Sequence, residues 1–278
     1  MFNTFRTGAL MAFLIVLFAL LGNAIAGSQG LIIAFVVAVA MNFASYWFSD
    51  KIVLRMYKAK EVGPQDAPEL FNMVDRLRKR ADLPMPAVYV IPSDQPNAFA
   101  TGRNPNHSAV AVTNGIVRLL NKEELEGVIG HELAHIKNRD ILTSSIAATI
   151  ASGITLLARF GPFLGGSRDR GNALVSLLMM FLAPFAAFLI QMAISRSREY
   201  VADRDGATIA QNPRALANAL ARLHQGVEHN PMPANEATAH MFIVSPFFGK
   251  GGFKSLFTTH PPAEERIQRL LAMEKEGR

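Results

Sequence analysis

The stretch "EGVIGHELAHIKNRD", residues 126–140, places two histidines four residues apart with a glutamate between them. Residues four apart lie on one face of an α-helix, so His131 and His135 can hold one metal ion together. Upstream, Asn121 and Glu124 have the spacing of a capping box, which predicts that a helix begins there. Apolar residues fill the rest of the stretch and predict a partly buried helix, where polar side chains are costly unless something binds them.

Neutral imidazole is a good zinc ligand, and the residue between the histidines suits catalysis. Glu132 is turned by about 100° around the helix from His131, so it can lean over a metal without binding it. Zinc lowers the pKa of a water that it holds, and a glutamate can take the proton of that water during attack on a carbonyl. The alternative is an ordinary polar helix surface, which the apolar flanks disfavour. The motif therefore predicts one catalytic zinc per chain, with His131 and His135 as ligands and Glu132 as base.

A third ligand has to come from another part of the chain, because the residues after His135 lack the continuation of the metzincin motif. The stretch "SRSREYVADRDGA", residues 195–207, offers Glu199 as a ligand. Asp203 lies one turn further on the same face and can support a ligand imidazole through its second ring nitrogen. A solvated charged helix is the alternative interpretation of this stretch. The other candidates for the third ligand are His224, Glu228, His229, Glu236 and His240.

Charge is unevenly distributed along the 278 residues. Residues 1–50 contain two charged side chains and residues 141–195 contain four, so the chain alternates apolar, polar, apolar and polar blocks. In the first block, residues 8–26 and 31–48 are each long enough for a membrane-spanning helix at about 1.5 Å per residue. The sequence "GSQG" between them predicts a tight turn. A cleaved signal peptide is the alternative for the first of these segments.

The second apolar block predicts another pair of spans, at residues 141–158 and 173–194, although both contain polar residues. The alternative is an apolar hairpin buried in a soluble domain or lying in the membrane interface. Four spans bring both polar blocks to one side of the membrane. Basic residues follow the second and fourth spans, so the positive-inside rule places the polar blocks in the cytoplasm. The arginines at 159, 168 and 170, between the third and fourth spans, argue against this orientation.

The first polar block predicts an α+β domain. Residues 66–81 have an apolar stripe with helical spacing, formed by Leu70, Phe71, Val74 and Leu77. The segments "PAVYVI", "NAFATG" and "SAVAVT" are strand candidates bounded by Pro, Gly or Asn, which is typical of a small antiparallel meander.

One of these segments has two interpretations. Residues 97–100 can simply form an edge of the sheet. Alternatively, this edge pairs with an extended substrate by strand addition, and the substrate-binding residues are then Asn97, Ala98, Phe99 and Ala100.

The chain contains no cysteine, which fits a reducing compartment. Its pI near 9.8 comes mostly from basic residues beside the predicted spans, and no basic stripe with interleaved aromatic residues indicates nucleic-acid binding.

Three motifs together carry a family resemblance: "GHELAHIKNRD", "SREYVADRDGA" and "THPPAEERI". With two leading apolar spans and "PNAFATG", they resemble the HtpX heat-shock proteases, which are membrane-embedded zinc metallopeptidases distantly related to the CAAX prenyl protease. The likeness covers nearly the whole chain. It implies the same three metal ligands and the same base, and it adds His260 and Arg266 as residues that stabilise the oxyanion.

The resemblance also implies a gluzincin-type endopeptidase in the bacterial cytoplasmic (inner) membrane, with its catalytic domain facing the cytosol. Its substrates would be misfolded or damaged membrane proteins, and it would cooperate with other membrane quality-control proteases. A processing protease for lipidated or membrane-anchored peptides is an alternative, disfavoured by the two-plus-two span pattern. A non-catalytic membrane transporter or scaffold with structural zinc is another, disfavoured because such sites usually have four ligands, often cysteines.

The sequence therefore predicts a mainly α membrane protein, with four transmembrane helices and an α+β zincin-like (gluzincin) catalytic domain containing a small antiparallel sheet. The expected domains are a transmembrane hairpin at 1–50, a first catalytic part at 51–140, a second transmembrane hairpin at 141–195 and a second catalytic part at 196–278.

Overall fold

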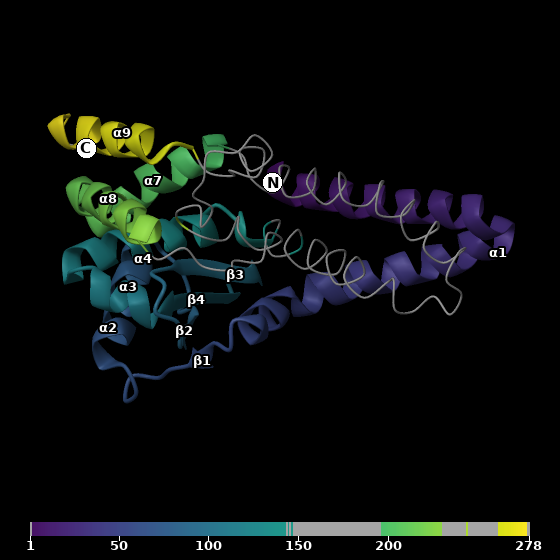
Figure 1. The fold of residues 1–278 in the computed structure, drawn as a ribbon, viewed down its shortest axis with the longest axis horizontal. Helices are drawn as coiled ribbons and strands as arrows, with labels where there is room; N and C mark the ends of the chain where they lie inside the picture. Colours follow the sequence, from purple (N-terminus) through teal and green to yellow (C-terminus); the bar gives the residue numbers. More distant parts are fainter. Residues whose placement is uncertain are drawn as a thin grey trace.

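The computed structural model describes residues 2–142, 144, 146, 196–229, 243 and 261–276 (Figure 1). A long helical stalk extends from a globular part that contains the sheet and the remaining helices. The described elements in chain order are α1 (Phe2–Met56), β1 (Lys60–Glu61), α2 (Pro68–Arg80), β2 (Ala87–Ile91), β3 (Ala98–Asn104), β4 (His107–Thr113), α3 (Asn114–Leu119), α4 (Lys122–Lys137), α7 (Arg196–Ala210), α8 (Pro213–His229) and α9 (Ala263–Lys275).

Helix α1 forms the stalk and reverses direction along its length (Figure 1). At Gly27 the backbone has a φ of +60°, a conformation that glycine adopts at little cost and that lets the chain turn back. The two arms contact each other, because Asn42 Nδ2 donates to the carbonyl of Met11 at 3.5 Å and both Leu14 and Ala38 are buried. Before and after the turn, α1 therefore behaves as two packed antiparallel arms.

One segment of α1, Gly27–Phe48, is long and apolar enough to cross a membrane, and it stands alone in this respect among the described residues. Only 17% of its most apolar window is buried within the molecule, so large apolar side chains face outward. Among them, Ile33 is 65% exposed and Phe43 is 62% exposed. That both arms cross a bilayer stays a prediction. The predicted spans at 141–158 and 173–194 lie almost entirely outside the described residues.

The predicted antiparallel meander is wrong, because the sheet is mixed. Its strand order is β1-β2-β4-β3, with β2 and β4 parallel and the two outer pairs antiparallel. The six residues between β2 and β3 do not form a tight turn. They are tied to the end of β4 and the start of α3 instead: Thr113 Oγ1 donates to the carbonyl of Gln95, and the N–H of Gly115 donates to the carbonyl of Ser93. This connection carries β3 past β2 to the far side of β4. Alternating apolar residues do not distinguish the two arrangements.

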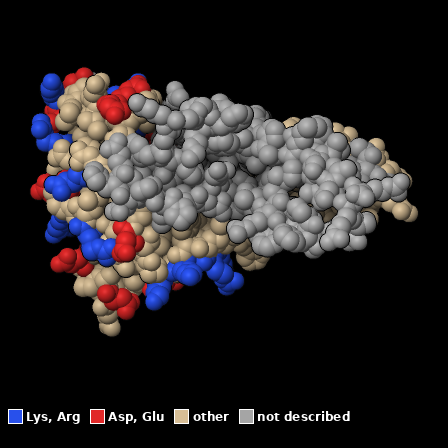
Figure 2. Space-filling view, viewed as in Figure 1, with Lys and Arg blue, Asp and Glu red and all other residues tan. Residues whose placement is uncertain are grey.

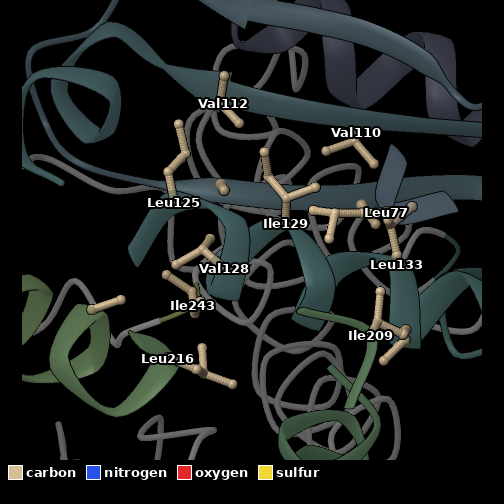
Figure 3. Close-up of a cluster of buried hydrophobic side chains, with 14 of the residues drawn as sticks. Leu77, Val110, Val112, Leu125, Val128, Ile129, Leu133, Ile209, Leu216 and Ile243 are labelled. Atoms are coloured by element: carbon tan, nitrogen blue, oxygen red, sulfur yellow. The ribbon is translucent and has the colours of Figure 1, made fainter. Parts of the chain in front are cut away.

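Helix α4 lies at the centre of the globular part, between the sheet and helices α7 and α8 (Figure 3). Ile129 and Leu133 of α4 pack toward the sheet with Val110 and Val112 of β4, all four fully buried. The predicted stripe on α2 faces the same core, with Leu70, Val74 and Leu77 buried and Phe71 partly buried. The sheet therefore covers one side of α4, and the helices that follow cover the other.

The opposite face of the sheet packs on the lower end of α1. A second apolar cluster joins Val53 and Leu54 of α1 to Phe99 of β3 and Ala111 of β4, and the rings of Tyr57 and Phe99 lie 5.6 Å apart. The stalk is thereby attached directly to the sheet that covers α4.

Candidate metal centre

The two histidines of the opening motif lie side by side on α4. The capping box predicted at its start is present: the side chain of Asn121 accepts from the N–H of Glu124, and the Glu124 carboxylate accepts from the N–H of Asn121. His131 is buried and His135 is partly buried, and their Nε2 atoms lie 3.2 Å apart. Two lone pairs that face each other at this distance repel unless a proton or a metal ion lies between them.

Helix α7 brings Glu199 to the same point. One carboxylate oxygen of Glu199 lies 3.8 Å from His131 Nε2, and the other lies 3.5 Å from His135 Nε2. Among the described residues, these three form the group whose ligand atoms could hold a metal ion, all within 4.8 Å of one another. Of the competing candidates, His224 lies 3.9 Å from Glu264 instead, while Glu236 and His240 lie outside the described residues.

The spacing of these atoms suits zinc. A zinc ion with bonds of about 2.0–2.1 Å in a tetrahedron keeps its ligand atoms about 3.3–3.4 Å apart. The observed separations of 3.2, 3.5 and 3.8 Å lie around this value. Two imidazoles and one carboxylate leave a fourth position for water or substrate, as in catalytic rather than structural zinc sites. The residues therefore fit a catalytic zinc ion.

Two glycines allow α7 to approach α4 closely enough to deliver Glu199. A Cβ atom added at Gly206 of α7 would lie 2.6 Å from the N and Cα atoms of His131. One added at Gly130 of α4 would lie 2.7 Å from the carbonyl oxygen of Gly206. The helices thus touch backbone to backbone directly beside the first metal ligand.

Asp203 has the place that its spacing from Glu199 predicts. Its Oδ1 lies 3.0 Å from Nδ1 of His131. Arg266 of α9 binds the same carboxylate with two bonds, of 2.8 and 2.7 Å. Burial opposes ionisation of Asp203, but this arginine and His131 outweigh it and lower the pKa of Asp203 to about 2. Asp203 is therefore a fixed negative charge that faces Nδ1 and leaves Nε2 for the metal.

Arg266 itself is buried, and its remaining contact ties a third segment to the site. Its Nη1 donates to the carbonyl of Ile243 at 2.9 Å. Its Nη2 lies 3.8 Å from Glu199. These contacts hold Asp203 and Glu199 in place, so the structure gives Arg266 a clear positioning function. The predicted contact of Arg266 with an oxyanion stays a prediction, and His260 lies outside the described residues.

A second supporting carboxylate, Asp140, was not foreseen from the sequence. Its Oδ2 lies 3.2 Å from Nδ1 of His135. Helix α4 ends in a Schellman motif: the N–H of Arg139 donates to Ile136, and the N–H of Asp140 donates to His135. Arg139 takes the left-handed φ of 59° that this motif needs. The motif folds Asp140 back over His135, and the only signal in the sequence is an acid placed just after the helix.

The buried charges around the histidines favour a cation. Burial alone would lower the pKa of His135, but nearby carboxylates raise it to about 9. Burial lowers the pKa of His131. Four buried carboxylates and two arginines lie around the histidines. The carboxylates belong to Glu132, Asp140, Glu199 and Asp203, and the arginines are Arg198 and Arg266. The carboxylates outnumber the arginines, so the negative potential of the site favours a bound cation.

Glu132 lies where a general base is needed. It is buried, and its Oε2 accepts a hydrogen bond of 2.7 Å from the N–H of Ala100 on β3. Burial raises the pKa of Glu132 to about 7, with Glu199 adding to the effect and His135 opposing it. A base whose pKa lies near neutrality can both take and return a proton, which is what amide hydrolysis requires.

Residues 97–100 lie at an edge of the sheet beside the metal centre, as both interpretations expect, and whether a substrate pairs with this edge stays a prediction. Because the N–H of Ala100 points away from β4, strand alternation directs the N–H and carbonyl of Ala98 to the same outer side. Asn97 binds inward through its N–H to Thr113 Oγ1. All four residues are buried.

Comparisons with known proteins agree with this geometry. The model of peptidase family M48 matches residues 64–274, which include every described residue of the metal centre. The chain belongs to peptidase family M48. It is 65% identical over 272 residues to a "Protease HtpX homolog" of Salinibacter ruber, with 98% of each chain covered. It is 58% identical over 278 residues to the "Protease HtpX homolog" of Thermodesulfovibrio yellowstonii, again with 98% of each chain covered.

A solved structure shares the fold of this M48 member. The crystal structure of S. mikatae Ste24p superposes with a TM-score of 0.55 at 18% identity, over 96% of this chain and 65% of that one. The sequence resemblance to membrane metalloproteases is thereby confirmed, and the chain is a metalloprotease with a metal cofactor.

Proposed function

We propose that this M48 member is a zinc endopeptidase that cleaves misfolded or damaged membrane proteins on the cytosolic side of a bacterial inner membrane. The observation that carries the catalytic part is the convergence of His131, His135 and Glu199 at zinc spacing, with the buried carboxylate of Glu132 beside them. Three ligands and a neighbouring base suit hydrolysis better than a closed structural site.

The chain's own residues divide the reaction between them. Zinc held by the three ligands would polarise the substrate carbonyl and lower the pKa of the attacking water. Glu132 takes the proton of that water on its carboxylate, and it then returns the proton to the leaving amine nitrogen. The N–H of Ala100 fixes the orientation of Glu132. Asp203 and Asp140 hold the two imidazoles with Nε2 toward the ion. His260, through the family resemblance, remains the candidate donor to the oxyanion.

The outer edge of β3 is the proposed platform for the substrate. An extended peptide could pair with the outward-facing N–H and carbonyl of Ala98 and the outward-facing carbonyl of Ala100, which would place its backbone beside Glu132. Main-chain pairing reads little of the substrate's sequence, so it suits a protease of misfolded proteins. Ala98 has no exposed surface, so a substrate reaches this edge only when the contacts that cover it open.

The exposed apolar arm of α1 supports a location in the membrane, and the basic residues that come after it favour the cytoplasm as the compartment of the catalytic domain. With α1 in the bilayer, the sheet packed on its lower end holds the metal centre close to the membrane surface. Substrates that emerge from the membrane would then meet the site directly.

Purified full-length protein tests the catalytic proposal. The wild type should hydrolyse an unfolded soluble protein, lose this activity to a zinc chelator and regain it with added zinc. Glu132→Gln should keep its zinc, because Glu132 is not a ligand, but lose most of its hydrolysis. Metal analysis of the same samples decides between the two functions of the residue, since a zinc-free Glu132→Gln protein would make Glu132 a ligand. Zinc-independent hydrolysis by the wild type would overturn the proposal.

A further inference from the structure

Basic side chains gather where α1 joins the globular part. We call this group the basic patch; its members are Lys51, Arg55, Lys58, Lys60 and Arg103. In Figure 2, blue atoms lie together on the underside of the molecule at this junction. All are exposed except Arg103, which is partly exposed. Between residues 47 and 61, the acidic residues are Asp50 and Glu61, so the patch is positive overall.

Arg103 and α1 are linked by a specific contact. Arg103 lies near the end of β3, and its guanidinium carbon sits 4.6 Å from the ring centroid of Trp47 on α1. Trp47 is 41% exposed and the neighbouring Phe48 is 48% exposed. An aromatic residue with one apolar side and one charged neighbour is typical of the boundary between membrane and water.

The length of α1 places the basic patch at the depth of lipid headgroups. The apolar segment Gly27–Phe48 ends at Phe48. Headgroups add about 5–8 Å to each side of the hydrocarbon core. At about 1.5 Å per residue, Lys51 lies roughly 5 Å beyond Phe48 and Arg55 roughly 10 Å beyond it, and long basic side chains reach back toward the membrane.

We propose that the basic patch is a binding surface for anionic lipid headgroups, and that the lipid phosphates contact α1 and the end of β3 together. Clusters of four or more basic residues beside a membrane helix attract anionic lipids. Here one member, Arg103, belongs to the same strand as Ala100, whose N–H holds Glu132. The lipid surface therefore contacts the membrane end of the strand that orients the catalytic base. This inference rests on the proposed placement of α1 in a bilayer.

The single tryptophan of the chain, Trp47, is a built-in probe of its lipid neighbours. The full-length protein is placed in bilayer discs of phosphatidylcholine with a minority of phosphatidylglycerol. In one preparation the bromine quencher is carried by phosphatidylglycerol, and in the other an equal mole fraction of phosphatidylcholine carries it. Brominated phosphatidylglycerol should quench Trp47 more strongly. The difference should correspond to a local enrichment of phosphatidylglycerol over phosphatidylcholine of about threefold or more. High salt should weaken the preference, because it shortens the screening length to about 3 Å at 1 M.

Two variants with the same change in net charge complete the experiment. The patch variant carries Lys51→Gln, Arg55→Gln, Lys58→Gln and Lys60→Gln, and it should lose the preference for brominated phosphatidylglycerol. The control variant carries Lys79→Gln, Lys122→Gln, Arg214→Gln and Lys275→Gln, away from α1, and it should keep that preference. Equal quenching of the wild type by the two lipids, or an unchanged preference in the patch variant, overturns the lipid site. Absence of quenching by either lipid instead refutes the placement of α1 in the bilayer.

Discussion

Replacement of Gly206 by alanine should weaken zinc binding without touching a ligand. The added Cβ would lie 2.6 Å from the backbone of His131, where ordinary contacts begin at 3.4 Å, so α7 and α4 must separate by about 0.8 Å. If this separation reaches Glu199, its 3.8 Å distance to His131 Nε2 grows further beyond the roughly 3.4 Å that tetrahedral zinc allows. The ligand geometry is then incompatible with a tight zinc complex unless the side chain of Glu199 adjusts.

Two opposing energies decide whether Gly206→Ala strengthens or weakens zinc binding. Alanine stabilises a helix interior by up to about 1 kcal/mol relative to glycine. Overpacking against a neighbour that cannot yield costs about 1–3 kcal/mol, and here the neighbour is backbone rather than a flexible side chain. If most of that strain falls on the zinc-bound form, zinc affinity should drop by about 10- to 100-fold, since 1.4 kcal/mol is tenfold.

Competition with a chromophoric chelator measures the zinc affinity of the purified Gly206→Ala protein, and hydrolysis is followed at saturating and at limiting zinc. Gly63→Ala is the matched control, because its Cβ would meet only the Asp66 carboxylate, at an ordinary 3.4 Å. Wild-type zinc affinity in Gly206→Ala, with an unchanged melting temperature, would refute the argument that this helix contact sets the ligand spacing.

Three further substitutions separate binding from positioning. Glu199→Ala should lose most bound zinc by metal analysis, and normal zinc content would mean that another residue is the third ligand. Asp140→Asn keeps the shape of the side chain but removes the charge opposite His135, so zinc affinity should fall by about 10–100-fold; an unchanged affinity would limit Asp140 to capping the helix end. Arg266→Ala leaves the buried carboxylate of Asp203 without its charged partner, so the free energy of unfolding should fall by about 3–5 kcal/mol. Thermal melting without added zinc checks this, and an unaltered melting temperature would contradict it.

Local features of the site could be predicted from the sequence because each depends on residues close together in the chain. The helical repeat predicts that His131 and His135 share one face, and Asn121 predicts where the helix begins. The pair Glu199 and Asp203 follows from the same repeat, and the structure places both against the histidines.

The features that were missed depend on contacts between distant segments. The order of the strands is decided by hydrogen bonds that tie residues 93–97 to the end of β4, and alternation within a strand does not encode this. Asp140 was missed because its use depends on a left-handed residue at Arg139, a conformation that usually requires glycine. A sequence search that expects glycine at the left-handed position of a Schellman motif would not find this site, because Arg139 occupies that position.

The spacing of residues along α7 is constrained because one face of the helix makes several contacts of the metal centre. Glu199, Asp203, Gly206 and Ala210 recur every three or four residues and so occupy one face of the helix. The first supplies the metal ligand, the second holds His131, and the third permits the close approach to α4. A shift of one residue would turn this face by about 100° and lose all of these contacts at once. The distance between the ligands is therefore set in large part by how closely α7 packs on α4.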